Sequence, residues 1–158
     1  MEVLSSRLLL RPRNLERSLD FYAGTLGLPV YREFGAGRQY GVVFFTGGGY
    51  LEVSGELAPG PKRGATTGPA DSTTTGPADS TVPGPAGAGP DASGIALWLQ
   101  VRDATTEVGR LAAAGVPVVR AVQREPWGLV EGWIEDPDGM RIGIVEVPND
   151  HPLRRRVD

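Results

Sequence analysis

The chain contains no cysteine and only one histidine and one lysine, and these shortages exclude several kinds of site. Without cysteine it forms no disulfide bond, has no thiolate metal ligand and has no cysteine nucleophile. The formal net charge of −3 provides no basic surface of the kind that nucleic acid requires. Its apolar runs fall well short of the ~20 residues that cross a bilayer, and its N-terminal residues lack the pattern of a signal peptide. We therefore expect a cytoplasmic protein with no nucleic-acid partner and no membrane partner.

Glycine and proline are abundant, with 23 and 14 among 158 residues, and they are concentrated between residues 57 and 93. This stretch lacks aromatic residues, and the octapeptide TTGPADST at residues 66–73 is repeated at residues 74–81. Such a composition buries too little apolar surface to offset the entropy lost on ordering. The sequence therefore predicts four parts: a first module (1–56), a flexible linker (57–93), a second module (94–147) and a polar, basic tail (148–158).

The two modules share one pattern of elements. In each, a short apolar strand precedes a helix with an Asx N-cap, Asn14 or Asp103, and a terminating glycine, Gly27 or Gly115. Three further strands follow each helix, so each module has a β-α-β-β-β order. The predicted strands are 8–10, 30–34, 40–45 and 50–54 in the first module, and 95–101, 116–122, 129–135 and 141–147 in the second.

Local motifs strengthen the match between this pattern and a known family. They are LERSLDFY at 15–22, LGL at 26–28, YLEV at 50–53, VRD at 101–103, LAAAGV at 111–116, PWG at 126–128 and DPDG at 136–139. With these motifs the chain resembles the vicinal oxygen chelate superfamily of glyoxalases, extradiol dioxygenases and bleomycin-resistance proteins. The resemblance implies an α+β fold in which two paired βαβββ modules form a cupped mixed sheet around a ligand cavity. It also implies a homodimer.

In the metal-dependent families, side chains on the first and fourth strands of both modules bind the metal, usually His or Gln on the first strands and Glu on the fourth. The matching first-strand positions here are Arg7 and Ala96, and the fourth-strand positions are Glu52 and Gly143. Only Glu52 is a metal ligand by chemistry. We therefore expect no metal and no other cofactor, with Arg7 as the counter-charge of Glu52. The alternative for this pair is that both are solvated strand ends.

Strand alternation sorts the side chains between the helix side and the cup. All three tryptophans fall on the predicted cup, Trp127 at its mouth, beside charged groups, and such a surface suits a flat small molecule with polar edges. The alternative for each tryptophan is ordinary core packing. The predicted ligand-binding residues are Arg7, Leu9, Arg11, Tyr50, Glu52, Trp98, Gln100, Trp127, Glu131, Trp133 and Arg141.

The leading functional hypothesis is a metal-free superfamily protein that binds a small aromatic or amphipathic molecule, as a drug- or metabolite-binding protein would. The alternative is an enzyme, a lyase, isomerase or dioxygenase, that uses Glu52 as a general base or an atypical metal ligand. No nucleophile paired with a base is apparent, because the single histidine, His151, lies in the tail. The tail itself is either a surface terminus or a segment that packs across a dimer partner.

Overall fold

The structure is a computed structural model that describes residue 2, residues 5–55 and residues 94–154. The predicted linker at 57–93 and the end of the tail at 155–158 lie outside the described residues. The elements are β1 (Arg7–Leu10), α1 (Leu15–Leu19), a π-helical turn η1 (Asp20–Thr25), β2 (Val30–Phe34), a 3-10 turn η2 (Gly37–Gln39), β3 (Gly41–Phe45), β4 (Tyr50–Ser54), β5 (Ala96–Val101), α2 (Ala104–Ala113), β6 (Val118–Arg124), β7 (Val130–Glu135), β8 (Arg141–Glu146) and a 3-10 turn η3 (Pro152–Arg154).

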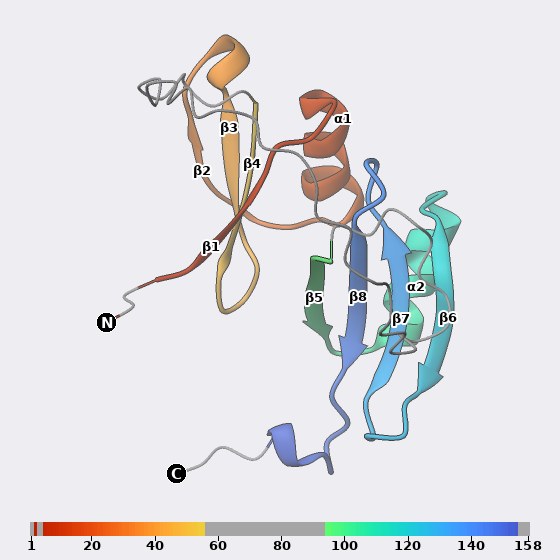
Figure 1. Cartoon of the computed structure of the whole chain (residues 1–158). Coiled ribbons are helices and arrows are strands. Elements are labelled where there is room, and N and C mark those ends of the chain that lie inside the picture. The colour runs from red at the N-terminus through yellow and green to blue at the C-terminus, as the bar shows by residue number, and fades with distance from the viewer. Residues whose placement is uncertain (1, 3–4, 56–93, 155–158) are drawn as a thin grey trace, which may run out of the picture.

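The strands form two four-stranded sheets with the same topology, β1-β4-β3-β2 and β5-β8-β7-β6 (Figure 1). The first and fourth strands of each module pair in parallel, and the other pairs are antiparallel. Arg7 lies opposite Tyr50 in the first module, and Ala96 lies opposite Arg141 in the second. In both modules, then, the first residue of the first strand pairs with the first residue of the fourth strand. The shared strand order and pairing confirm the predicted α+β fold with two βαβββ modules.

The first helix starts as predicted but does not continue as one regular helix to Gly27. The side chain of Asn14 caps its N-terminus by accepting a 3.0 Å hydrogen bond from the Arg17 amide. After Leu19 the backbone widens into the π turn. In this geometry both Phe21 and Tyr22 are buried. The apolar residues that recur at helical spacing, Leu15, Leu19, Tyr22 and Leu26, include Tyr22 but not Phe21, so this spacing gives no signal of the wider turn.

The second helix ends at Gly115, whose φ of 83° needs a glycine-like backbone. The next amide, that of Val116, donates a 3.0 Å hydrogen bond to the Leu111 carbonyl and closes the helix end. Because that amide is used and Pro117 has none, β6 begins at Val118, two residues later than predicted. The other strands begin and end within one residue of the predicted limits.

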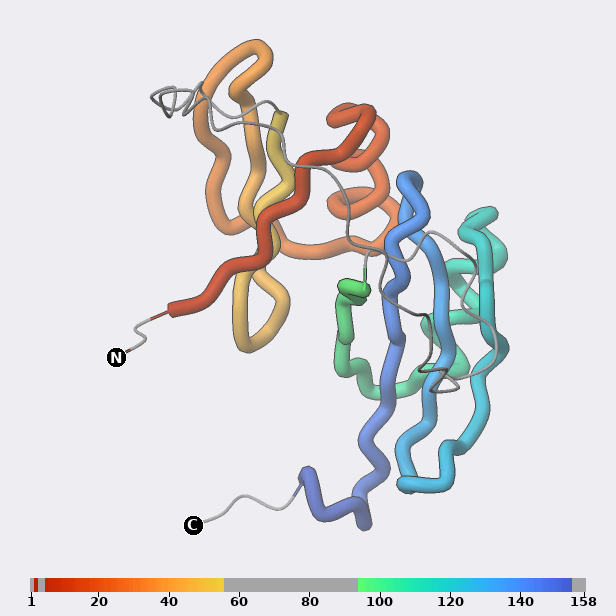
Figure 2. Tube along the Cα trace, in the orientation of Figure 1, coloured from red at the N-terminus to blue at the C-terminus, as the bar shows by residue number. Residues whose placement is uncertain are grey.

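One hydrophobic core serves both modules. Leu51 on β4 and Ile142 and Ile144 on β8 belong to it, together with Leu111 of α2 and Tyr22 of η1. Figures 1 and 2 show α1 lying between the first sheet and the turn that joins β7 to β8. The modules therefore join through their helix sides. Within the described part of the chain, no helix has the length and apolar character needed to span a membrane.

Polar contacts fix this junction. The buried Tyr22 hydroxyl donates a 2.8 Å hydrogen bond to Asp136 Oδ2. The other oxygen of Asp136 accepts from the amides of Asp138 and Met140, so the turn presents an ordered carboxylate. Burial, reinforced by the neighbouring Asp136 carboxylate, strongly raises the pKa of Tyr22, which keeps the hydroxyl as the donor. On the far side of the junction, Arg110 donates to the Thr25 carbonyl at 2.8 Å.

We expect Tyr22→Phe to lower the free energy of unfolding by about 1–3 kcal/mol, because it leaves a buried carboxylate oxygen without its donor. Urea denaturation measures the loss. Tyr40→Phe is the matched control, since it removes an exposed hydroxyl bond to Glu33 and should change stability by no more than about 0.5 kcal/mol. Equal losses in the two variants would contradict the anchoring role of Tyr22.

Candidate ligand-binding site

On the side of the first sheet that faces away from the core, two arginines and a serine surround the Glu52 carboxylate. We call this group the Glu52 network. This carboxylate is 8% exposed and accepts from Arg7 Nη1 at 2.8 Å and from Arg11 Nη2 at 3.3 Å. The Ser54 hydroxyl, two residues along β4 on the same side, donates a third hydrogen bond at 3.0 Å. The pairing of Arg7 with Glu52 is confirmed. The role of Ser54 was not predicted, although the two-residue alternation of β4 contains the signal for it.

These partners also control the protonation of Glu52. Burial by itself raises the pKa of a carboxyl group, but the hydrogen bonds from Arg7 and Ser54 and the charges of both arginines outweigh it. The net effect lowers the pKa below the ordinary value of 4.5. Glu52 is therefore an ionised carboxylate with several donors at neutral pH, which makes it a weak proton acceptor.

An aromatic cluster adjoins this network on the first sheet. The Tyr50 ring lies 4.8 Å from the Tyr31 ring and 5.9 Å from the Phe45 ring, measured between centroids. Leu9 on β1 is 53% exposed. Only Tyr50 and Leu9 were predicted. Phe45 lies directly opposite Tyr50, so cross-strand register indicates it, whereas Tyr31 sits at a bulge in β2 where simple alternation fails.

Two tryptophans flank a glycine on the second sheet. Gly143 on β8 has Trp98 opposite it on one side and Trp133 on the other. A Cβ atom at position 143 would lie 3.3 Å from the Trp133 ring, so the indole occupies the space that a side chain would need. Trp98 is 45% exposed. The predicted positions of both tryptophans on this side of the sheet agree with the register.

A second charge network lies beside these tryptophans. Arg120 on β6 contacts Glu125 at 2.6 Å and Glu131 at 3.3 Å, and its guanidinium lies 5.8 Å from the Trp133 ring centroid. The Trp127 indole N–H donates a 3.0 Å hydrogen bond to Glu131. Sequence reasoning missed the role of Arg120 because two irregularities in the β6 register, on either side of it, remove the alternation that would reveal its side.

The predicted site residues thus form two groups, one on each sheet. The first face consists of Arg7, Leu9, Arg11, Tyr50 and Glu52, and the second face consists of Trp98, Gln100, Trp127, Glu131, Trp133 and Arg141. Arg141 is paired with Glu135 at 2.9 Å. Each face has its own charged and aromatic residues, and the junction between the modules lies on the opposite, helix side of the sheets.

Two further residues, one at the end of β8 and one in the tail, have structural partners. Glu146 accepts a 3.2 Å hydrogen bond from the Ala104 amide at the start of α2, so it faces the helix and not the tryptophans. His151 Nε2 lies 2.9 Å from the Trp127 carbonyl oxygen, and its Nδ1 accepts from the Leu153 amide. The described part of the tail therefore packs against the loop that carries Trp127.

The residues at the four family metal positions do not fit a metal. Ala96 and Gly143 have no donor atom, and the space beside Gly143 is filled by Trp133. Glu52 is held by two arginines, of which Arg7 occupies the remaining ligand position. Within residues 5–55 and 94–154, no three His, Asp or Glu side chains gather as a metal site requires.

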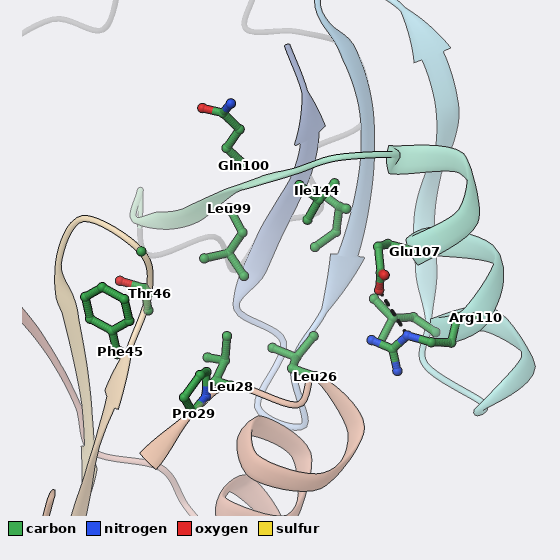
Figure 3. A pocket seen from close by; sticks show the side chains of 13 residues that line it. Leu26, Leu28, Pro29, Phe45, Thr46, Leu99, Gln100, Glu107, Arg110 and Ile144 are labelled. Atoms are coloured by element: carbon green, nitrogen blue, oxygen red, sulfur yellow. Dashed lines mark hydrogen bonds and ion pairs between the residues drawn. The ribbon is translucent and has the colours of Figure 1, made fainter. Parts of the chain in front are cut away.

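A cleft of about 350 Å³ lies on the helix side between the modules (Figure 3). Leu26, Leu28, Leu99 and Ile144 form its apolar wall, and the Glu107–Arg110 ion pair lies at its edge. Figure 3 shows Gln100 projecting to the opposite side of β5 from Leu99. The apolar wall of the cleft thus lies on the Leu99 side of β5, although Gln100 also lines the cleft, and the sequence did not predict it.

Comparison with solved structures shows the same fold. The chain matches TioX from Micromonospora sp. ML1 at 19% identity (91% of this chain, 98% of that chain, TM-score 0.60). It matches TnmS3, an antibiotic binding protein from Streptomyces sp. CB03234, at 18% identity (93% and 98%, TM-score 0.60). It matches lactoylglutathione lyase from Agrobacterium tumefaciens at 18% identity (92% and 94%, TM-score 0.59).

A search of the curated proteins finds no match. The sequence profile of one family, however, extends across both modules and matches residues 5–144. Together with the repeated βαβββ topology, this match establishes the family. The chain belongs to the Glyoxalase/Bleomycin resistance protein/Dioxygenase superfamily.

Proposed function

We propose that the protein binds a small aromatic or amphipathic molecule without a metal, as a drug- or metabolite-binding protein. The observation that carries this proposal is the pair Trp98 and Trp133 around Gly143, where metal-dependent members of the superfamily have a carboxylate ligand. Two indole rings thus lie beside the position of a family metal ligand, and their faces offer a flat ligand a large apolar contact. The similarity to the antibiotic binding protein TnmS3 agrees with this use of the fold.

The neighbouring charges supply the polar edge of such a site. Glu131 and Arg120 lie beside the Trp133 ring and are already paired with each other, so they present fixed hydrogen-bonding groups at the edge of the ring. A mostly apolar surface with a few fixed polar groups is typical of small-molecule sites. The same proposal places the protein in the cytoplasm, since a chain without cysteine needs no oxidising compartment to fold.

We also propose that the protein is a homodimer in which the first face of one copy covers the second face of the other. β1 and β5 are edge strands of their sheets, and both carry an exposed apolar residue, Leu9 and Trp98. The Glu52 network has two arginines and one carboxylate, whereas the Arg120 network has one arginine and two carboxylates. Their opposite net charges favour this face-to-face pairing.

Light scattering coupled to size-exclusion chromatography tests the dimer. We expect a dimeric wild-type chain and a monomeric Leu9→Glu variant, because the new carboxylate would face the acidic second face of the partner. Val118→Glu changes an exposed residue on β6, at the opposite edge of its sheet from β5, and should remain dimeric. A monomeric wild-type protein would contradict the proposed assembly.

Ligand binding is tested with 2-naphthamide, a neutral planar probe, by isothermal titration calorimetry. We expect Trp98→Ala to weaken binding about tenfold, because it removes the exposed aromatic contact. Val118→Ala alters a residue opposite the core residue Ile134, on the other side of the sheet from the tryptophans, and should bind as the wild type does. Unchanged affinity in Trp98→Ala would show that the second face is not the site. Native mass spectrometry of protein from its own host extract would identify a copurified natural ligand.

The enzymatic alternative depends on Glu52, and the geometry of this residue favours binding over catalysis. Its donors lower its pKa and engage both carboxylate oxygens, which opposes a role as a general base or as a metal ligand. Elemental analysis of the purified protein separates the two functions. Stoichiometric Zn, Fe, Mn or Ni that is lost in Glu52→Ala would establish the alternative and refute the metal-free proposal.

The Glu52 network also predicts a pH dependence of stability. Because its pKa is lower in the folded than in the unfolded chain, the network contributes stability above about pH 4.5, and this contribution is lost as the pH falls through the folded value. The difference in unfolding free energy between wild type and Glu52→Gln should therefore be largest near neutral pH and shrink in acid. Glu107→Gln, which alters an exposed ion pair, is the control and should show little change with pH. A difference for Glu52→Gln that is independent of pH would contradict the pairing.

A further inference from the structure

A second hollow, of about 1020 Å³, adjoins the cleft on the helix side and lies where the two modules and the tail meet. We call it the hairpin–tail cleft: it is lined by the β3–β4 hairpin tip (Thr46, Gly47, Gly48), the end of β5 and the residue after it (Trp98, Gln100, Val101, Arg102), and the tail (Asn149, Leu153, Arg154). Figure 1 shows this loop reaching towards β5, with the tail turning back below the second sheet. Segments far apart in the sequence thus build one open site.

The charges of this cleft are all of one sign. Arg102 and Arg154 line it, and none of its lining residues is acidic. Arg154 donates from Nε to the Val147 carbonyl at 2.7 Å, which fixes its side chain near the cleft while most of its other N–H groups stay available. Arg102 has no hydrogen bond or ion pair with any residue that the structure describes. The arginines of this cleft differ from Arg7 on the first face and Arg120 on the second face, which are both paired with glutamates.

The same cleft contains an aromatic surface. Trp98 and Gln100 lie on one side of β5, and Figure 3 shows the Gln100 side chain on the opposite side of this strand from Leu99. An indole face gives contact to a planar ring, the amide of Gln100 supplies neutral donors and acceptors, and a guanidinium binds a carboxylate in its plane. The distance along the strand from Trp98 to Arg102 suits a ligand whose ring and anion lie at opposite ends.

We propose that the hairpin–tail cleft binds a small aromatic molecule that carries a carboxylate or a similar anionic group. Its ring packs on Trp98, and its anion is held by Arg102 with the help of Arg154. This inference rests on the proposed binding function, since Trp98 belongs to both. It adds a requirement for an anionic ligand group, which the second face does not impose because its Arg120 is already paired with two glutamates.

The test compares 2-naphthoate with its neutral analogue 2-naphthamide. The chain has three tryptophans, so a ¹H–¹⁵N correlation spectrum has three indole N–H signals, which Trp→Phe variants assign. Titration then gives an affinity for each probe and identifies the indole that it touches. We expect 2-naphthoate to bind about tenfold more tightly than 2-naphthamide and to shift the Trp98 signal most. Added salt should reduce this preference.

Arg102→Gln should remove the preference for the anion and leave the affinity for 2-naphthamide unchanged. The matched control is Arg38→Gln, because Arg38 lines another arginine-rich hollow, near the start of α1, together with Arg11 and Arg13. The control should keep the full preference. Both substituted residues are exposed, so neither change should disturb the fold, and thermal unfolding of each variant checks this.

Three results would overturn the inference. They are equal affinity for both probes, a preference that survives in Arg102→Gln, and a preference that is lost in Arg38→Gln instead. In each of these cases, binding of 2-naphthamide that depends on Trp98 would leave the proposed binding function intact. Binding of neither probe would refute the inference and the aromatic-binding function together.

Discussion

The buried hydrogen bond between Tyr22 and Asp136 determines how the two modules are joined. It connects the π turn of the first module to the β7–β8 turn of the second, on the helix side of both sheets. A carboxylate oxygen left without a donor at this depth would be costly, so the bond favours the arrangement of the modules in which Asp136 Oδ2 meets the Tyr22 hydroxyl. This junction on the helix side also determines which sides of the two sheets stay outside the shared core. Modules joined by their helix sides leave the opposite sides of both sheets free of this junction, and the predicted ligand-binding residues lie there.

The exposed faces carry charges that are largely neutralised within each sheet. Glu52 is held by two arginines and Arg120 by two glutamates, so each face is preorganised before any ligand or second copy arrives. Fixed ion pairs reduce the side-chain entropy that binding would otherwise cost. The hairpin–tail cleft differs in having arginines and no acid among its lining residues. The charge pattern therefore distinguishes an aromatic surface whose Arg120 is paired with two glutamates from the neighbouring cleft that we propose for an anion.

Local signals in the sequence were sufficient for most of the fold. Asn14 and Asp103 cap the helices as predicted, and alternation along β4 and β8 assigned Glu52 and Gly143 to the correct sides of their sheets. Prediction failed where the backbone departs from a regular period. The π turn, the bulge at Tyr31 and the irregular register around Arg120 all break the alternation. The division of the site between two sheets depends on Tyr22–Asp136, a contact 114 residues apart that no local pattern encodes.

The absence of a side chain at Gly143 leaves the space that the Trp133 ring occupies. The Trp133 ring would lie 3.3 Å from a Cβ at this position, so an indole at 133 and a carboxylate side chain at 143 compete for one space. A glutamate at 143 would displace the ring and separate it from Arg120, whose guanidinium now lies over it. Restoring a ligand at this single position would also be insufficient, because Arg7 and Ala96 supply no donor suited to a metal. A carboxylate ligand at position 143 and the present position of the Trp133 ring therefore exclude each other, which is why we propose aromatic binding rather than metal binding for this chain.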